Sequence, residues 1–178
     1  MCGRFTLTTP ERRPVAEILG VDPESLPKDY RPRYNIAPTD PHFIDTSRYE
    51  QRRTTSARSG LVNSWAHDNS RAAAAIDAKA ETIDTRGAFR GGGSPGADAW
   101  FRPMDPYDMG GRQRLRRMRF HRKDGGPILF AGLYESWFPQ RNQPQLTLTI
   151  VTGAANGVIA PIHDECRCCS MSAGPTIG

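Results

Sequence analysis

Hydrophobic residues recur with helical spacing in one early segment, residues 10–20. Thr9 is a candidate N-cap, Pro10 suits the first helical position, and Gly20 suits the left-handed residue that follows a helix. The apolar residues that share a face at this spacing are Val15, Ile18 and Leu19. The pattern therefore predicts a short helix over 10–20.

Strand-forming residues dominate two later segments, 127–138 (PILFAGLYESWF) and 145–156 (QLTLTIVTGAAN). Both are rich in β-branched and aromatic residues, which predicts buried strands. We also expect short strands within 41–62 and a turn at 64–68 (SWAHD). In residues 72–83 the alanines favour a helix, but composition alone does not assign this segment.

Three segments show neither helical nor strand periodicity. Residues 30–40 (YRPRYNIAPTD) are punctuated by prolines and predict an extended loop. Residues 90–126 show no regular pattern, and the small and polar residues of 165–178 predict a disordered tail. The sum is a single domain over 1–164 of the α+β class, rich in β-structure, with short flanking helices and an altered or truncated C-terminal part.

Composition narrows the class of protein. A chain of 178 residues with 37% hydrophobic residues suits one globular domain. It has no run of about 18 apolar residues, and its N-terminus, MCGRFTLTTPERR, has no apolar segment, so we expect neither a membrane span nor a secretory signal. Its four cysteines do not form a disulfide framework, which favours a reducing, cytoplasmic location.

The positive charge is concentrated in one stretch. The chain carries a net charge of +5, while residues 102–123 alone carry seven arginines and one lysine against Asp105 and Asp108. The remainder is therefore close to neutral. Such a stretch can bind nucleic acid non-specifically, or it can be an ordinary solvated segment.

Cys2 offers a distinctive chemistry if Met1 is removed. The α-amine, with a pKa of roughly 7.7–8.0, and the thiol, at roughly 8.5, would then lie on adjacent carbons. A 1,2-aminothiol condenses with an aldehyde and closes to a five-membered thiazolidine ring. The alternative is an ordinary cysteine at a frayed terminus.

Several short motifs occur in one fixed order along the chain. They are MCGRF (1–5), YNIAPT (34–39), GLVNSWAHD (60–68), DAKAET (77–82), ADAWF (97–101), FAGLYESW (130–137), TIVTGAAN (149–156) and IHD (162–164). Together they resemble the SOS response-associated peptidase (SRAP) family of abasic-site processing proteins, over most of residues 1–164. The resemblance implies a strand or loop after Ile76.

The resemblance also implies a function. Members of the family bind single-stranded DNA that carries an abasic site, and their N-terminal cysteine captures the sugar aldehyde as a thiazolidine crosslink. They are called peptidases because the residues before that cysteine are removed. We accordingly expect an enzyme of the hydrolase and lyase classes that acts in DNA repair, with Cys2 as the nucleophile. We further expect a nucleoid-associated monomer that needs no cofactor.

The resemblance assigns roles to further residues. Asp77 stands where the family has an asparagine that hydrogen-bonds the abasic sugar; an aspartate accepts hydrogen bonds but cannot donate them once ionised. It either helps to deprotonate the Cys2 amine or weakens the site. Lys79 matches the basic residue that holds a phosphate, and Glu81 matches a structural position. His163 matches the histidine that supports proton transfer.

The DNA-lining positions of the family correspond to Arg4, Asn35, Trp65 and Thr152. Trp65 is either a stacking wedge against a base or a core residue. Arg102 stands where the family has its catalytic glutamate, and a guanidinium cannot shuttle protons near neutral pH.

The sequence is also compatible with two alternatives, a non-catalytic module that binds single-stranded DNA and a degraded, inactive member of the family. A zinc site made by His163 with the tail cysteines lacks the usual ligand spacing, so we expect no metal.

Overall fold

The computed structural model describes residues 5–48, 51–90, 97–101, 128–140, 142–157, 160–161 and 163–167. Its strands are β1 (Phe5–Leu7), β2 (Arg33–Ile36), β3 (Pro41–Arg48), β4 (Gln51–Ser59), β5 (Asp77–Lys79), β6 (Ala97–Phe101), β7 (Ile128–Gln140), β8 (Gln143–Ala154) and β9 (Glu165–Arg167). Its helices are α1 (Arg12–Leu19) and α2 (Gly87–Arg90), with 3-10 turns η1 (Pro23–Ser25), η2 (Ala72–Ala74) and η3 (Ala80–Thr82). This composition confirms the predicted α+β class.

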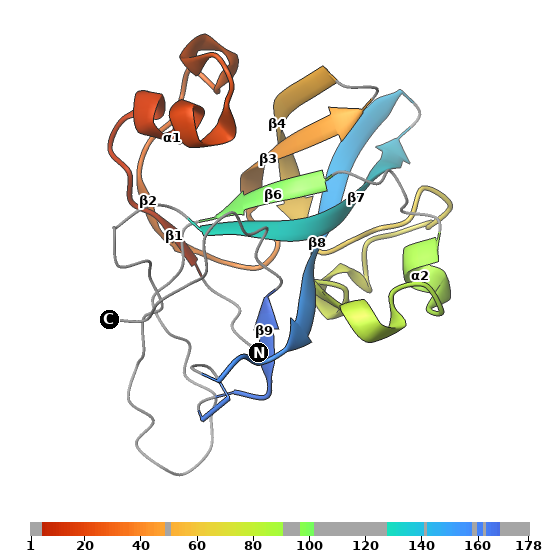
Figure 1. The fold of residues 1–178 in the computed structure, drawn as a ribbon. Helices are drawn as coiled ribbons and strands as arrows, with labels where there is room; N and C mark the ends of the chain where they lie inside the picture. Colours follow the sequence, from red (N-terminus) through yellow and green to blue (C-terminus); the bar gives the residue numbers. More distant parts are fainter. Residues whose placement is uncertain are drawn as a thin grey trace.

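The larger sheet closes on itself. Its strands follow the order β4-β3-β6-β7-β8-β5, and β4 also pairs in parallel with β8 through Arg58↔Thr147 and Ser59↔Leu148. Figure 1 shows β3, β4, β6, β7 and β8 curling around one another, with α1 at one end of the molecule and α2 at the other. Closure pairs strand edges that would otherwise present unpaired backbone groups. A separate sheet consists of β1 and β2.

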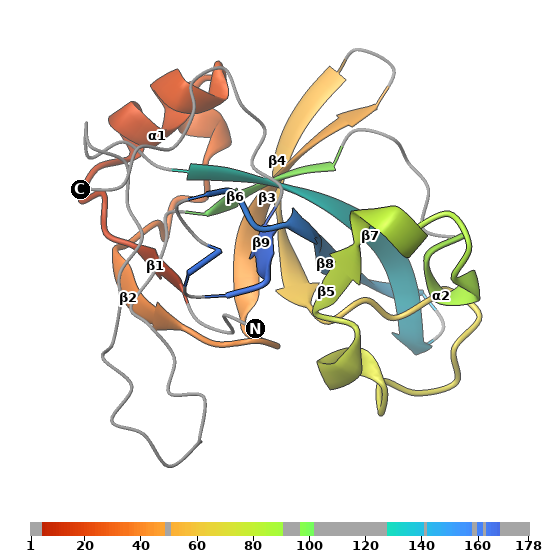
Figure 2. The same cartoon turned by 60° about the horizontal axis from the view of Figure 1, so that its bottom comes forward.

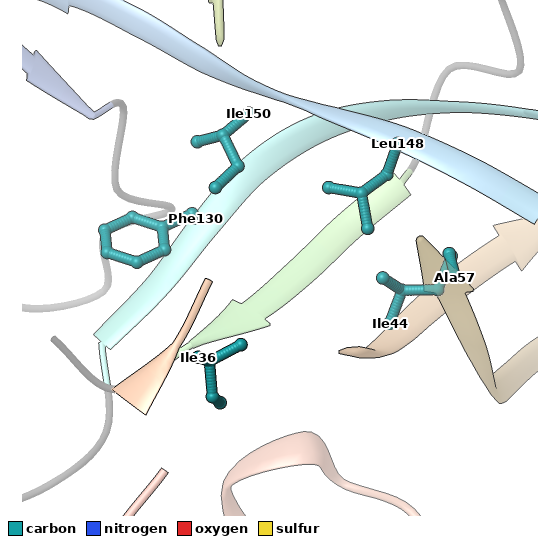
Figure 3. Packing of buried hydrophobic residues seen from close by; sticks show 6 residues of the cluster. All are labelled: Ile36, Ile44, Ala57, Phe130, Leu148 and Ile150. Atoms are coloured by element: carbon teal, nitrogen blue, oxygen red, sulfur yellow. The ribbon is translucent and has the colours of Figure 1, made fainter. Parts of the chain in front are cut away.

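The main hydrophobic core lies on the concave side of this closed sheet (Figure 3). Its buried members are Ile36, Ile44, Ala57, Phe130, Leu148 and Ile150. They come from β2, β3, β4, β7 and β8, so the smaller sheet packs on the larger one through Ile36. Thr147 and Thr149 are also fully buried, and the Thr147 hydroxyl donates a hydrogen bond to the Val62 carbonyl at 3.2 Å.

The predicted N-terminal helix exists, but it begins two residues later than expected. It starts at Arg12 after Glu11, and Gly20 ends it with a φ of 62°, as predicted. A start at Pro10 would set the ring of Pro14 against the carbonyl of the residue four positions earlier, whereas a start at Arg12 places Pro14 in the first turn. The predicted cap at Thr9 is therefore wrong.

One member of the predicted helix face is also wrong. Ile18 is 42% exposed, and the buried face of α1 is made by Val15, Ala16 and Leu19. These residues pack with Leu26 and the half-buried Leu129. Ile18 thus lies at the border of the apolar face.

The strands predicted over 127–138 and 145–156 are confirmed as β7 and β8, and residues 41–62 hold β3 and β4. The turn at 64–68 is confirmed by the Ala66 N–H, which donates to the Asn63 carbonyl at 2.9 Å. The ambiguous segment 72–83 resolves into two 3-10 turns around β5.

Four of the described strands, β1 among them, form where the sequence predicted none. β2 fits between Pro32 and Pro38 in the predicted loop, and β6 lies in the patternless segment between β3 and β7. β9 occupies the start of the predicted disordered tail. Each is short and depends on backbone pairing with a distant partner, so local composition did not reveal it.

A side chain at Gly60 would disrupt the local backbone. Its φ is 104°, its N–H donates to the Leu148 carbonyl at 2.8 Å, and a Cβ there would lie 2.6 Å from the Ala72 carbonyl oxygen. The residue thus permits the chain leaving β4 to cross close to η2.

We expect Gly60→Ala to lower the free energy of unfolding by about 1–3 kcal/mol through backbone strain, with a further loss from the clash. Chemical denaturation measures this change. Gly157→Ala is the control, because a Cβ at Gly157 would meet nothing within 4 Å. Equal stability of the two variants would contradict the role assigned to Gly60.

Candidate nucleic-acid site at the end of strand β8

The carboxyl-terminal part of β8 gathers residues from three strands. β5 pairs with it in parallel through Asp77↔Ile150 and Lys79↔Thr152, and β9 pairs antiparallel through Thr152↔Arg167 and Ala154↔Glu165. Figures 1 and 2 both show β9 beside the end of β8, and Figure 2 also shows β5 beside it. This pairing brings four predicted site residues into one region: Asp77, Lys79, Thr152 and His163.

Lys79 presents a charged group at this region. Its Nζ lies 2.5 Å from Oε1 of Glu165, and its side chain is 53% exposed. The hydrogen bond from the ammonium to Glu165, assisted by the charge of that carboxylate, raises the pKa of Lys79 above its ordinary value. Lys79 is therefore a full positive charge at neutral pH.

His163 is held through Nδ1. The backbone N–H of Glu165 donates to this atom at 2.9 Å, and Oδ1 of Asp164 lies 3.1 Å from it. When the ring is neutral, Nδ1 can accept from the Glu165 N–H, and Nε2 then carries the proton. The hydrogen bond from the Glu165 N–H therefore fixes the orientation of the ring.

Asp77 and Thr152 lie beneath the surface of this region. Both carboxylate oxygens of Asp77 are shielded from solvent, and Thr152 is 4% exposed. The Thr152 hydroxyl donates to the Ala78 carbonyl at 3.5 Å, so that this side chain holds β5 against β8.

Trp65 is presented to solvent by a clamped loop. Its side chain is 71% exposed, so the core-packing interpretation is wrong. The loop on either side of it is fixed: the Ser64 N–H donates to Glu135 Oε1 at 2.9 Å, and Trp137 Nε1 donates to the Ala66 carbonyl at 2.8 Å. An exposed indole on a fixed loop can stack against a flat aromatic group.

Glu135 is a supporting residue that sequence reasoning missed. Its Oε2 accepts from Asn63 Nδ2 at 3.2 Å, while Oε1 accepts from the Ser64 N–H. One carboxylate therefore holds two consecutive residues next to Trp65. FAGLYESW contains this glutamate, but the motif does not show that its partner lies 71 residues away.

The remaining predicted residues are placed as follows. Asn35 is exposed on β2, next to Tyr34, which is 63% exposed. Cys2, Arg4 and Arg102 lie outside the described residues. Within the described ranges, no three metal-binding side chains cluster, and no helix is long and apolar enough to cross a membrane.

Solved structures share this fold. A protein from Bacteroides thetaiotaomicron superposes with a TM-score of 0.76 at 14% identity, covering 96% of this chain and 78% of its own. A protein from Bordetella bronchiseptica superposes with a TM-score of 0.68 at 14% identity, covering 93% and 78%.

The chain is more similar in sequence to two named proteins of Bacillus subtilis. The chain is 32% identical to the abasic site processing protein YoqW of Bacillus subtilis over 176 residues, 93% of this chain and 74% of that protein. It is 32% identical to the abasic site processing protein YoaM of the same organism over 170 residues, 93% and 73%. The family model described as SOS response associated peptidase (SRAP) matches residues 1–169. The chain belongs to the SRAP family.

Proposed function

We propose that this protein processes abasic sites in single-stranded DNA and captures their aldehyde covalently through Cys2. The relatives named abasic site processing proteins support this function. The observation that carries it is that Glu165 contacts both Lys79 and His163 at the end of β8, which places an exposed cation and a histidine in one region. A cation suits a backbone phosphate, and the histidine suits the condensation chemistry.

The covalent step follows from the 1,2-aminothiol. Hydrolytic removal of Met1 releases the α-amine of Cys2. That amine attacks the aldehyde carbon of the ring-opened sugar and expels one water molecule, which leaves an imine. The Cys2 sulfur then adds to the imine carbon as its proton passes to nitrogen. The product is a thiazolidine with one C–N and one C–S bond, and no electron is gained or lost.

The described residues have supporting roles in this proposal. Lys79 holds a phosphate as a point charge, and His163 relays protons during water loss and ring closure. Asp77 accepts a proton or a hydrogen bond from the α-amine in this proposal. The protein acts as a monomer on DNA in the nucleoid.

Trp65 supplies a stacking surface in this proposal, and Trp65→Ala should weaken binding of single-stranded DNA. The loss of one base–aromatic contact corresponds to about 1–3 kcal/mol, or roughly 5- to 150-fold in Kd. Fluorescence anisotropy with a labelled oligonucleotide measures it. Trp65→Phe should retain most of the affinity, and the melting temperature should hardly change because the side chain is 71% exposed. Unaltered affinity in Trp65→Ala would contradict the stacking role.

One experiment separates the proposed function from its alternatives. The protein is incubated with a single-stranded oligonucleotide carrying a natural abasic site, and parallel samples are run on native and denaturing gels. A complex that survives denaturation supports covalent capture. A complex seen only on the native gel, and lost at high salt, identifies a non-catalytic binding module. The absence of both identifies an inactive member of the family.

A further inference from the structure

Glu165 already forms an ion pair with Lys79, the cation that binds DNA in the proposed function. The ion pair reaches across β8, because Lys79 belongs to β5 and Glu165 to β9. The register places Lys79 opposite Thr152 and Glu165 opposite Ala154. Thr152 and Ala154 are two residues apart on one strand, so both charged residues project from the same face of the sheet.

The backbone of Glu165 is fixed in place. Its N–H donates to His163 Nδ1 at 2.9 Å, and the preceding carbonyl, of Asp164, accepts from the Ala155 N–H at 3.1 Å. The Glu165 side chain is 21% exposed, against 53% for Lys79. The carboxylate is thus a built-in partner of the lysine, presented by a paired strand.

A carboxylate and a phosphate compete for the same donor. Each offers anionic oxygens, and the lysine ammonium is a compact point charge with three N–H donors. We propose that Glu165 is an intramolecular competitor for the DNA phosphate at Lys79, so that position 165 sets the affinity for single-stranded DNA. This inference rests on the proposed function.

The exposure of the pair determines the size of the effect. A half-exposed ion pair is weak and opens readily, so Glu165 would moderate DNA binding without preventing it. Phosphate binding at Lys79 would release the carboxylate to solvent beside the DNA backbone, and its negative charge would then oppose the bound strand. Both effects lower affinity.

The test uses Glu165→Gln, which keeps the shape of the side chain and removes its charge. The probe is a single-stranded oligonucleotide with a tetrahydrofuran abasic analogue, which has no aldehyde and reports non-covalent affinity alone. We expect Glu165→Gln to bind about two- to fivefold more tightly than the wild type, the range for a half-exposed ion pair. The slope of log K against log salt should steepen by up to about 0.7, because in the wild type the released carboxylate takes up a cation that offsets one released from the DNA.

Two controls isolate the pair. Glu81→Gln removes an equal charge that acts on Lys79 through space, and it should change affinity less than twofold. In a Lys79→Ala background, Glu165→Gln should keep only the smaller gain that comes from lost charge repulsion, because the site of competition is gone. Unchanged or weaker binding by Glu165→Gln in the wild-type background, or an equal gain in the Lys79→Ala background, overturns the inference.

Two parallel measurements keep the result interpretable. Thermal unfolding shows whether Glu165→Gln preserves the fold, and NMR titration of the Lys79 ammonium should show its pKa falling toward the ordinary value of about 10.4. Crosslinking to a natural abasic site tests the proposed function separately. A wild type that crosslinks, with no affinity change in a folded Glu165→Gln variant, rejects the competitor and leaves the function intact.

Discussion

Cys2→Ala is expected to abolish the covalent complex with abasic DNA. Alanine lacks the thiol, so the ring cannot close, and any imine formed by the α-amine hydrolyses. Non-covalent binding should persist, because the proposed DNA contacts are those of Lys79 and Trp65. The measurement is the fraction of a labelled abasic oligonucleotide that remains shifted on a denaturing gel, alongside the Kd for the tetrahydrofuran analogue.

The controls for this prediction use chemistry and position. Cys2→Ser should retain an imine that borohydride traps, but it should form no stable crosslink without a reductant. Cys166→Ser removes a different thiol and should crosslink at the wild-type rate. Full crosslinking by Cys2→Ala, or its loss in Cys166→Ser, would show that another group carries the reaction.

Arg102→Glu is expected to accelerate crosslinking. The resemblance to the family puts an acid/base glutamate at this position, and such a group typically contributes about 10²–10⁴-fold in rate. The wild-type arginine cannot exchange protons near neutral pH, so water or His163 must serve instead. We expect a single-turnover rate at least about tenfold above wild type near pH 7.

Arg102→Gln is the matched control for this variant. It removes the positive charge and nearly reproduces the shape of glutamate, but it has no titratable proton. It should therefore leave the rate close to that of the wild type, and only Arg102→Glu should gain a pH dependence in the carboxylate range. Equal rates for the two variants would show that residue 102 does not occupy the catalytic position.

The strongest strands were predictable from sequence, and the short ones were not. β7 and β8 carry long runs of strand-forming residues, and their predicted positions agree with the structure. β6 spans Ala97–Phe101 within a segment that shows no pattern, and it forms between β3 and β7 by pairing with both. Its stability comes from neighbours distant in sequence, which local propensity does not report.

The candidate site was also predictable only in part. Short motifs identified Lys79, His163 and Trp65 as candidate site residues. The structure shows that Trp65 is exposed rather than packed in the core. Glu135 and Glu165 did not stand out, because their importance depends on contacts with residues far along the chain: Ser64 for the first and Lys79 for the second. A carboxylate does not stand out in a sequence, because its partner is known only from the structure.

In the proposed function, Cys2 freed of Met1 captures the abasic aldehyde as a thiazolidine. Intact-mass spectrometry of the crosslinked complex tests it most directly, followed by peptide mapping of the DNA-bearing residue. We expect a mass equal to the protein without Met1 plus the oligonucleotide minus one water molecule, unchanged by borohydride, with the adduct on Cys2. A crosslink that retains Met1, or one that maps to a lysine and gains two hydrogens on reduction, would contradict it.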